Sequence, residues 1–332
     1  MNPAAPSVRT ETPSGPRRPA GPAGRPGRAR AASRSGLRAR YRRAARLAFL
    51  LPAALYVLFA FVVPVIYNLI LSFEVTTPAT IANLFAPWAG VSNYKITLLQ
   101  SITQSALIRT LSFTVLSLIF QFLIGFGLAL LFNLRFPLNK LARSLVIVPW
   151  LLPFLVTGFI FRFLFQLEAG AVNQVLLDVH LINQPIGYLL SPGWAYVTVL
   201  ITNIWLGVPF FTVLLYSALQ DVPPELKEAA MIDGAGPWQC LVRVTLPVIR
   251  PVIEVTFVLG FVFTIKVFDI VISLTQGGPA NSTQLIATWA WSLSFQQFDY
   301  GAGAALNTVL LIIALLVAPV YIRLNRDSLR QG

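Results

Sequence analysis

The residue types that most often perform chemistry are scarce in this sequence. The 332 residues include one cysteine, Cys240, and one histidine, His180. These numbers exclude a disulfide framework, a Cys/His zinc site and a cysteine–histidine nucleophile system. His180 stands in an apolar-flanked loop with no nucleophile motif nearby. We therefore predict no catalytic residue and no metal site in this chain.

Two charged residues interrupt an apolar stretch in the second half of the chain. Lys266 and Asp269 lie three positions apart, so on a continuous helix they would share one face and could pair. Alternatively, the helix ends before them and both side chains reach water. In a third interpretation, Lys266 binds a phosphorylated solute.

Small, polar and aromatic residues form two stripes at helical spacing. Asn203, Leu206, Gly207 and Phe210 follow the i, i+3, i+4, i+7 pattern, and a second such stripe begins at Gly260. A polar amide inside an apolar helix is tolerated where it lines a cavity. Helix–helix packing produces the same pattern, so from the pattern alone both interpretations stay open.

The composition indicates that these residues lie in a membrane protein. Hydrophobic residues make up 56% of the chain and charged residues 11%, against about 25% in soluble domains. The net charge of +13 is concentrated in residues 1–46, which contain twelve arginines and one acid. That segment is predicted to be a disordered cytoplasmic tail that contacts anionic lipid. We favour lipid over nucleic acid because an apolar segment follows directly.

Six uncharged or nearly uncharged runs are long enough to cross a bilayer as helices. They are residues 47–73, 110–132, 144–161, 194–219, 251–274 and 300–322. The two tails and two of the five links carry 21 lysines and arginines, against one to three in the other links. The excess of positive charge predicts that both termini are cytoplasmic.

The cytoplasmic link of residues 221–250 has internal order. Pro223 and Pro224 precede a predicted short helix from Glu225 to Ile232. Asp233-Gly234 breaks that helix, and a second one is expected from Trp238 to about Pro247. By these residues alone, the link could be an ordinary surface connector.

The residues of this link resemble a specific family motif. Glu228-Ala229-Ala230, Asp233-Gly234-Ala235 and Leu246-Pro247 have the spacing of the "EAA" loop of ABC-importer permeases. Further segments of residues 47–325 are similar to the sugar permeases of that family, including residues 203–210 and Val148-Pro149-Trp150. The resemblance implies an all-α, polytopic membrane protein with the type I importer permease fold and six transmembrane helices. It implies ATPase coupling by Glu228, Ala229, Ala230, Asp233, Gly234, Ala235 and Pro247.

By alignment of motifs, the resemblance also implies a sugar site. Its positions are Trp150, Asn203, Leu206, Gly207, Phe210, Gly260, Phe263 and Thr264. Trp150 and Phe263 would stack on the sugar ring, while Asn203 and Thr264 would bind hydroxyls. Thr264 is less polar than the amide of maltose permeases, which leaves trehalose, other disaccharides and glycerol phosphates open.

The chain contains no G-x-x-x-x-G-K-[ST] phosphate loop, so ATP and Mg²⁺ are expected in a partner. The implied partners are a second homologous permease, an ABC ATPase dimer and an extracytoplasmic substrate-binding protein, in the bacterial inner membrane. The expected organisation is a tail of residues 1–46, a permease domain of residues 47–325 and a tail of residues 326–332. A secondary transporter or channel working alone is the alternative, and an intramembrane enzyme is a weaker one.

Overall fold

The computed structural model describes residues 49–80 and 86–324, with side chains to residue 316. The predicted tails, residues 1–46 and 326–332, lie outside the described residues. The chain divides into two units at Val63/Pro64. The described part of the first unit, residues 49–63, is helical. No β-strand occurs in the described residues, where Glu74 and Trp88 form an isolated bridge.

Four helices are long and apolar enough to cross a membrane. They are Phe49–Leu71, α4 (Ser101–Asn133), α8 (Pro192–Gln220) and the continuous helix Pro237–Ile265. The first contains the π-helical turn η1 (Leu58–Val62) followed by α2 (Val63–Leu71). The last is built from α10 (Pro237–Cys240), the π-helical turn η2 (Leu241–Thr245) and α11 (Leu246–Ile265). The first, second, fourth and fifth predicted spans are thus helical.

The third predicted span is broken in the middle. It consists of α5 (Asn139–Leu151) and α6 (Phe154–Leu164), which meet at an angle of 101°. Pro153 explains the break because a proline lacks the amide donor and forces the preceding residue into extended backbone. Leu152 accordingly has ψ 136°. The pair counts as a fifth span if both halves belong to one crossing.

The fifth predicted span ends earlier than expected. Helix α11 stops at Ile265, and α12 (Asp269–Leu274) begins after three residues outside either helix. The prediction that Lys266 and Asp269 share a helix face is therefore wrong. The two side chains are exposed and do not form an ion pair within 4.0 Å.

The start of that same helix also differs from the sequence prediction. The second helix of the 221–250 link does not end near Pro247 but continues through Pro247 and Pro251 into the span. Pro247 lies in the first turn of α11, where a missing amide donor costs little. The wider turn η2 directly precedes it, and such turns accommodate irregular hydrogen bonding within a helix.

The last long helix, α14 (Tyr300–Leu324), covers the sixth predicted span. Its apolar described part, Tyr300–Leu316, is shorter than a full crossing, so the number of six spans remains a prediction. The shorter helices are α3 (Ser92–Leu99), α7 (Ala171–Asp178), α9 (Pro224–Ile232), α13 (Ile286–Trp291) and the π-helical turn η3 (Ser292–Gln296).

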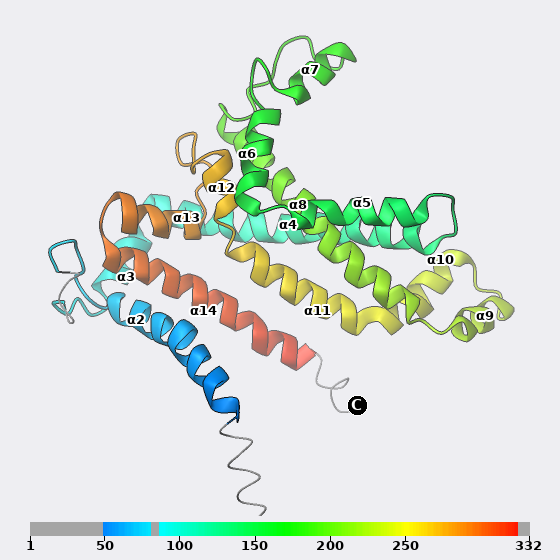
Figure 1. Cartoon of the computed structure of the whole chain (residues 1–332), viewed down its shortest axis with the longest axis horizontal. Coiled ribbons are helices and arrows are strands. Elements are labelled where there is room, and N and C mark those ends of the chain that lie inside the picture. Colours follow the sequence, from blue (N-terminus) through cyan, green and yellow to red (C-terminus); the bar gives the residue numbers. More distant parts are fainter. Residues whose placement is uncertain (1–48, 81–85, 325–332) are drawn as a thin grey trace, which may run out of the picture. The chain divides into compact units, whose positions relative to one another are not determined.

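The second unit is centred on α4 and α8, which pack along each other, with α11 against both (Figure 1). Close packing depends on glycine: a Cβ on Gly125 of α4 would lie 2.6 Å from the Cβ of Phe211 of α8. Apolar side chains such as Phe211 and Leu215 are fully buried between these helices. At one end of α8 and α11 the chain forms the α9–α10 elbow (Figure 1). This arrangement positions the two candidate sites.

Candidate solute cavity and coupling elbow

Buried polar side chains connect α4 to α8 midway along both helices. The Asn203 amide donates to Ser117 Oγ over 2.9 Å, and the Gln121 amide donates to the Asn203 carbonyl oxygen over 3.0 Å. All three residues are buried. Asn203 Oδ1 and Thr264 Oγ1 of α11 make no hydrogen bond with the described residues, and neither oxygen is fully sealed from solvent. These two oxygens are therefore available to a hydroxyl-bearing ligand.

Two glycines let the three helices approach at this level. A Cβ on Gly207 would lie 2.2 Å from Gln121 Nε2, and a Cβ on Gly260 would lie 2.8 Å from Phe211 Cζ. Both distances are too short for any larger residue without movement of the neighbour. Both glycines thus serve helix packing, and the Cβ position of Gly260 faces Phe211 and Leu118.

Three aromatic rings form a connected cluster beside these groups. The Trp150 and Phe210 ring centroids lie 5.9 Å apart, and those of Phe210 and Phe263 lie 5.6 Å apart in an edge-on arrangement. Trp150 is 46% exposed and Phe263 is 50% exposed in the isolated chain. The three rings come from α5, α8 and α11, so the cluster depends on the break at Pro153 that ends α5.

These residues enclose a cavity of about 460 Å³. The volume falls within the range of roughly 300–1,000 Å³ that is usual for small-molecule sites. All eight positions implied by the sequence lie on its walls: Trp150, Asn203, Leu206, Gly207, Phe210, Gly260, Phe263 and Thr264. The structure thus brings together residues from three separated sequence segments. Their role in binding a solute stays a prediction.

Seven further residues line the cavity, of which only Lys266 was predicted to bind a solute, in the interpretation with a phosphorylated one. They are Gln121, Phe154, Val267, Phe268 and Ile270, together with the charged residues Lys266 and Asp269. The sequence could have indicated Gln121 as a cavity residue, because it is the one amide side chain inside the apolar run of the second span. The sequence could not place Phe154 and Phe268 at the cavity, because their positions depend on the two helix breaks. With one cation and one anion, the formal charges on the wall sum to zero.

The elbow has the geometry that its motif predicts. Helix α9 begins with Pro224 and ends at Ile232, and Gly234 has φ +84°, a conformation that favours glycine. The Ala235 amide donates to the Ala230 carbonyl oxygen over 2.9 Å, which closes the turn. Glu228, Ala229, Asp233 and Gly234 are exposed, whereas Pro247 lies in α11 and outside this turn.

Two large apolar side chains of the elbow also reach the surface. Ile232 is 86% exposed and Trp238 is 73% exposed. Exposed aromatic and aliphatic residues beside polar ones are typical of protein interfaces. The motif did not single out either residue, although each is a bulky apolar residue in a charged link. The elbow is a candidate docking surface.

The fold and these two sites define a class of protein: a helical, multi-pass membrane transport component. Residues 121–330 match the family described as "Binding-protein-dependent transport system inner membrane component". The match covers more than half of the chain, so the chain belongs to this family. It is an ABC-importer permease, as the EAA motif predicts, and it is distinct from the subunits that hydrolyse ATP.

Curated relatives belong to the same group of permeases. The chain is 32% identical to the sulfoquinovosyl glycerol transport system permease of Agrobacterium fabrum, over 84% of this chain and 89% of the relative. It is 30% identical to the trehalose/maltose transport system permease of Thermococcus litoralis, over 72% and 80%. It is 31% identical to the diacetylchitobiose uptake system permease of Streptomyces coelicolor, over 90% and 89%.

A solved structure shares the fold. A chain of a bacterial ABC transporter involved in import of the acidic polysaccharide alginate superimposes with a TM-score of 0.74 at 25% identity. The alignment covers 86% of this chain and 96% of that chain. The type I importer permease fold, expected from the sequence, is thus confirmed.

Proposed function

We propose that this permease imports a neutral sugar of about disaccharide size by alternating access. The observation that carries the proposal is the cavity of about 460 Å³, whose walls include both aromatic rings and free polar oxygens. Aromatic faces suit the C–H side of a sugar ring, while amide and hydroxyl groups bind its hydroxyls. The relatives named for sugars support the same substrate class.

The charges of the cavity favour a neutral solute over a phosphorylated one. Lys266 could attract a phosphate, but Asp269 lines the same cavity. An anionic solute would meet both, so the attraction of one is offset by the repulsion of the other. Glycerol phosphate is therefore the second candidate substrate, carried only by the presence of Lys266.

The proposed assembly contains a second homologous permease, an ABC ATPase dimer and an extracytoplasmic substrate-binding protein. The exposed elbow, with Glu228, Asp233 and Gly234, supports contact with the ATPase. The proposed location is the bacterial inner membrane with both termini cytoplasmic, supported by the distribution of lysine and arginine. A transporter that acts alone would be recovered without an ATPase subunit when the chain is purified from its native membrane.

The substrate proposal is tested with the purified assembly in proteoliposomes. We expect trehalose or another disaccharide, presented with the binding protein, to stimulate ATP hydrolysis and to enter the vesicles. Glycerol 3-phosphate at the same concentration should do neither. Stimulation by glycerol 3-phosphate with none by any disaccharide would overturn the neutral-sugar proposal and leave the permease assignment intact.

A further inference from the structure

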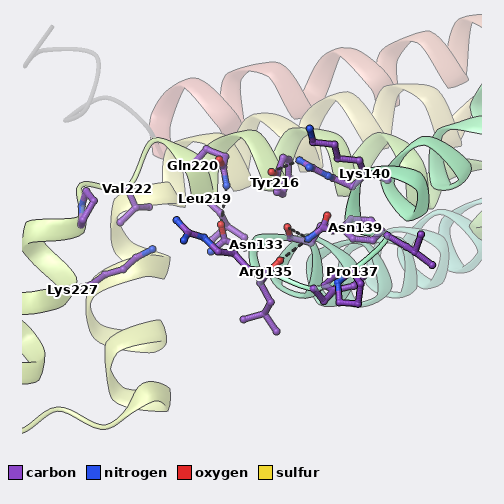
Figure 2. A pocket seen from close by; sticks show the side chains of 16 residues that line it. Asn133, Arg135, Pro137, Asn139, Lys140, Tyr216, Leu219, Gln220, Val222 and Lys227 are labelled. Carbon is purple, nitrogen blue, oxygen red and sulfur yellow. Dashed lines mark hydrogen bonds between the residues drawn. The ribbon is translucent and has the colours of Figure 1, made fainter.

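A second cavity, of about 1000 Å³, lies at the end of α4, where the loop to α5 meets the end of α8 and the start of α9 (Figure 2). Four cationic side chains line it: Arg135, Lys140, Arg143 and Lys227. Its lining includes no aspartate or glutamate among the described residues. A cluster of this kind creates a strongly positive local potential.

The four cations have no close anionic partner within the described part of the chain. None of the four forms an ion pair there within 4.0 Å. Arg143 instead donates to Tyr216 Oη and lies over the Tyr216 ring, 4.9 Å from its centroid. Figure 2 shows Lys227 reaching from α9 toward Arg135 on the α4–α5 loop. Like charges that converge in this way repel unless an anion lies between them.

The walls of this cationic cavity are fixed by hydrogen bonds. The Asn139 amide donates to the carbonyl oxygens of Phe132 and Leu134, and the Gln220 amide donates to Asn133 Oδ1 over 2.8 Å. These bonds hold the loop between α4 and α5 against the end of α8. The backbone segment that carries Arg135 and Lys140 is therefore ordered before any ligand arrives, and Arg143 is held by its contact with Tyr216, which lowers the cost of binding.

The cationic cavity shares part of its wall with an apolar groove. The groove, of about 420 Å³, lies along α5 and α8 and shares Lys140, Arg143 and Tyr216 with the cationic cavity. Its further lining includes Val146, Ile147 and Val213. Helix α8 is long and apolar enough to cross a membrane, and α5 is one half of the bent apolar pair, so the groove lies between two apolar helices. A ligand that fills both spaces has an anionic head and an apolar tail.

We propose that this combined site binds an anionic phospholipid, with its phosphate among the four cations and one acyl chain in the groove. A free phosphate or a nucleotide would use the cations and leave the groove unexplained. The ATPase would approach through the elbow, and the coupling residues Glu228, Asp233 and Gly234 are not part of the lining. The proposal is independent of the identity of the transported solute.

The test measures lipid retention by the full-length chain, purified with its co-expressed partners. The assembly is exchanged into nanodiscs of phosphatidylcholine with about one-fifth phosphatidylglycerol, extracted, and analysed by native mass spectrometry. Wild type should retain phosphatidylglycerol preferentially. In the Arg135→Gln/Lys227→Gln variant, the ratio of retained phosphatidylglycerol to phosphatidylcholine should be about tenfold lower than in wild type. The reason is that each cation near a membrane surface attracts anionic lipid. The matched control, Lys95→Gln/Arg243→Gln, removes the same charge outside the cavity and should behave as wild type.

Two further measurements distinguish a bound phospholipid from a bound free phosphate. Val213→Trp fills the groove without changing a charge and should also reduce retention of phosphatidylglycerol. Inorganic phosphate at millimolar concentration should not displace the lipid. Equal retention by the double variant and wild type overturns the proposal. So does unchanged retention in Val213→Trp, displacement by phosphate, or loss of the ATPase subunit from the double variant with its lipid retained.

Discussion

Gly207 and Gln121 meet at the wall of the central cavity, and their contact leads to a stability prediction. Gly207→Ala places a methyl group 2.2 Å from Nε2 of Gln121, which is itself hydrogen-bonded to the Asn203 carbonyl oxygen. We expect the amide to be displaced and the purified assembly to lose about 1–3 kcal/mol of stability, the cost of an unmade buried hydrogen bond. Thermal unfolding in detergent measures the loss.

A double-variant comparison isolates this contact. Gln121→Ala removes the clashing amide, so adding Gly207→Ala to it should cost much less than Gly207→Ala costs alone. Gly127→Ala is the control, because a Cβ there, on helix α4 like Gln121, meets no atom within 4 Å. If the stability losses of Gly207→Ala and Gln121→Ala simply add in the double variant, the contact between these two residues is not the cause of the Gly207→Ala loss.

The aromatic cluster gives a prediction about affinity. Trp150→Ala or Phe263→Ala removes a ring that is about half exposed, so the loss of stability should be small. If the rings stack on sugar, each substitution should weaken binding of the solute by about 0.5–1.5 kcal/mol, or roughly two- to thirteenfold. Uptake at several solute concentrations measures this. Phe163→Ala, at a 60% exposed phenylalanine outside the cavity, is the control.

At the residue scale the sequence predicted eight wall positions, and the structure brings all eight to one cavity. It could not predict the Gln121–Asn203 contact, because a hydrogen bond between α4 and α8 depends on their mutual rotation. For Lys266 and Asp269 the sequence suggested a contact that the structure does not contain. Their spacing suggested a pair on one face, but that inference required a helix that continues past Ile265.

At the scale of elements, the elbow turn allows a clean test of coupling. Gly234 has φ +84°, and a Cβ there would meet no atom within 4 Å, so Gly234→Val strains the backbone alone. The strain should be roughly 1–3 kcal/mol. We expect the variant to insert in the membrane but to lose coupling between ATP hydrolysis and uptake, measured together in proteoliposomes.

Gly236 supplies the matched control for this experiment. A Cβ on it also meets no atom within 4 Å, but its φ is −71°, which suits valine. Gly236→Val should therefore keep near wild-type coupling. Normal coupling in Gly234→Val would mean that the turn conformation is not needed for contact with the ATPase.

The sequence predicted where the helices lie better than where they break, and the prolines show why. The apolar runs located the helices because length and lack of charge decide which segments can cross a bilayer. Pro153 breaks its span, yet Pro247 and Pro251 lie within a continuous helix. The residue type is the same in each case. The difference lies in the backbone beside each proline: Leu152, before Pro153, is extended, whereas the residues before Pro247 and Pro251 stay helical.

At the scale of the whole molecule, the motif of the 221–250 link is sufficient to indicate the family. Its spacing joins a Glu-Ala-Ala run inside α9, an Asp-Gly-Ala turn that ends α9 and a Leu-Pro pair at the start of α11. The number of crossings was less well determined. Helix α14 is apolar over Tyr300–Leu316 in its described part, so six crossings remains the prediction of the hydropathy pattern.

The exposed Ile232 and Trp238 have a consequence for how this protein is produced in a cell. A copy made without partners leaves both side chains exposed on the elbow, where proteases and chaperones can recognise an unassembled subunit. We expect a shorter half-life in pulse-chase labelling when the chain is expressed alone than when it is expressed with the ATPase. Ile232→Ser/Trp238→Ser should lengthen the half-life of the lone chain and prevent assembly, whereas Leu99→Ser, at another exposed apolar residue, should do neither. The cell would then have to make the permease and the ATPase in matched amounts, because Ile232 and Trp238 expose any excess permease to degradation.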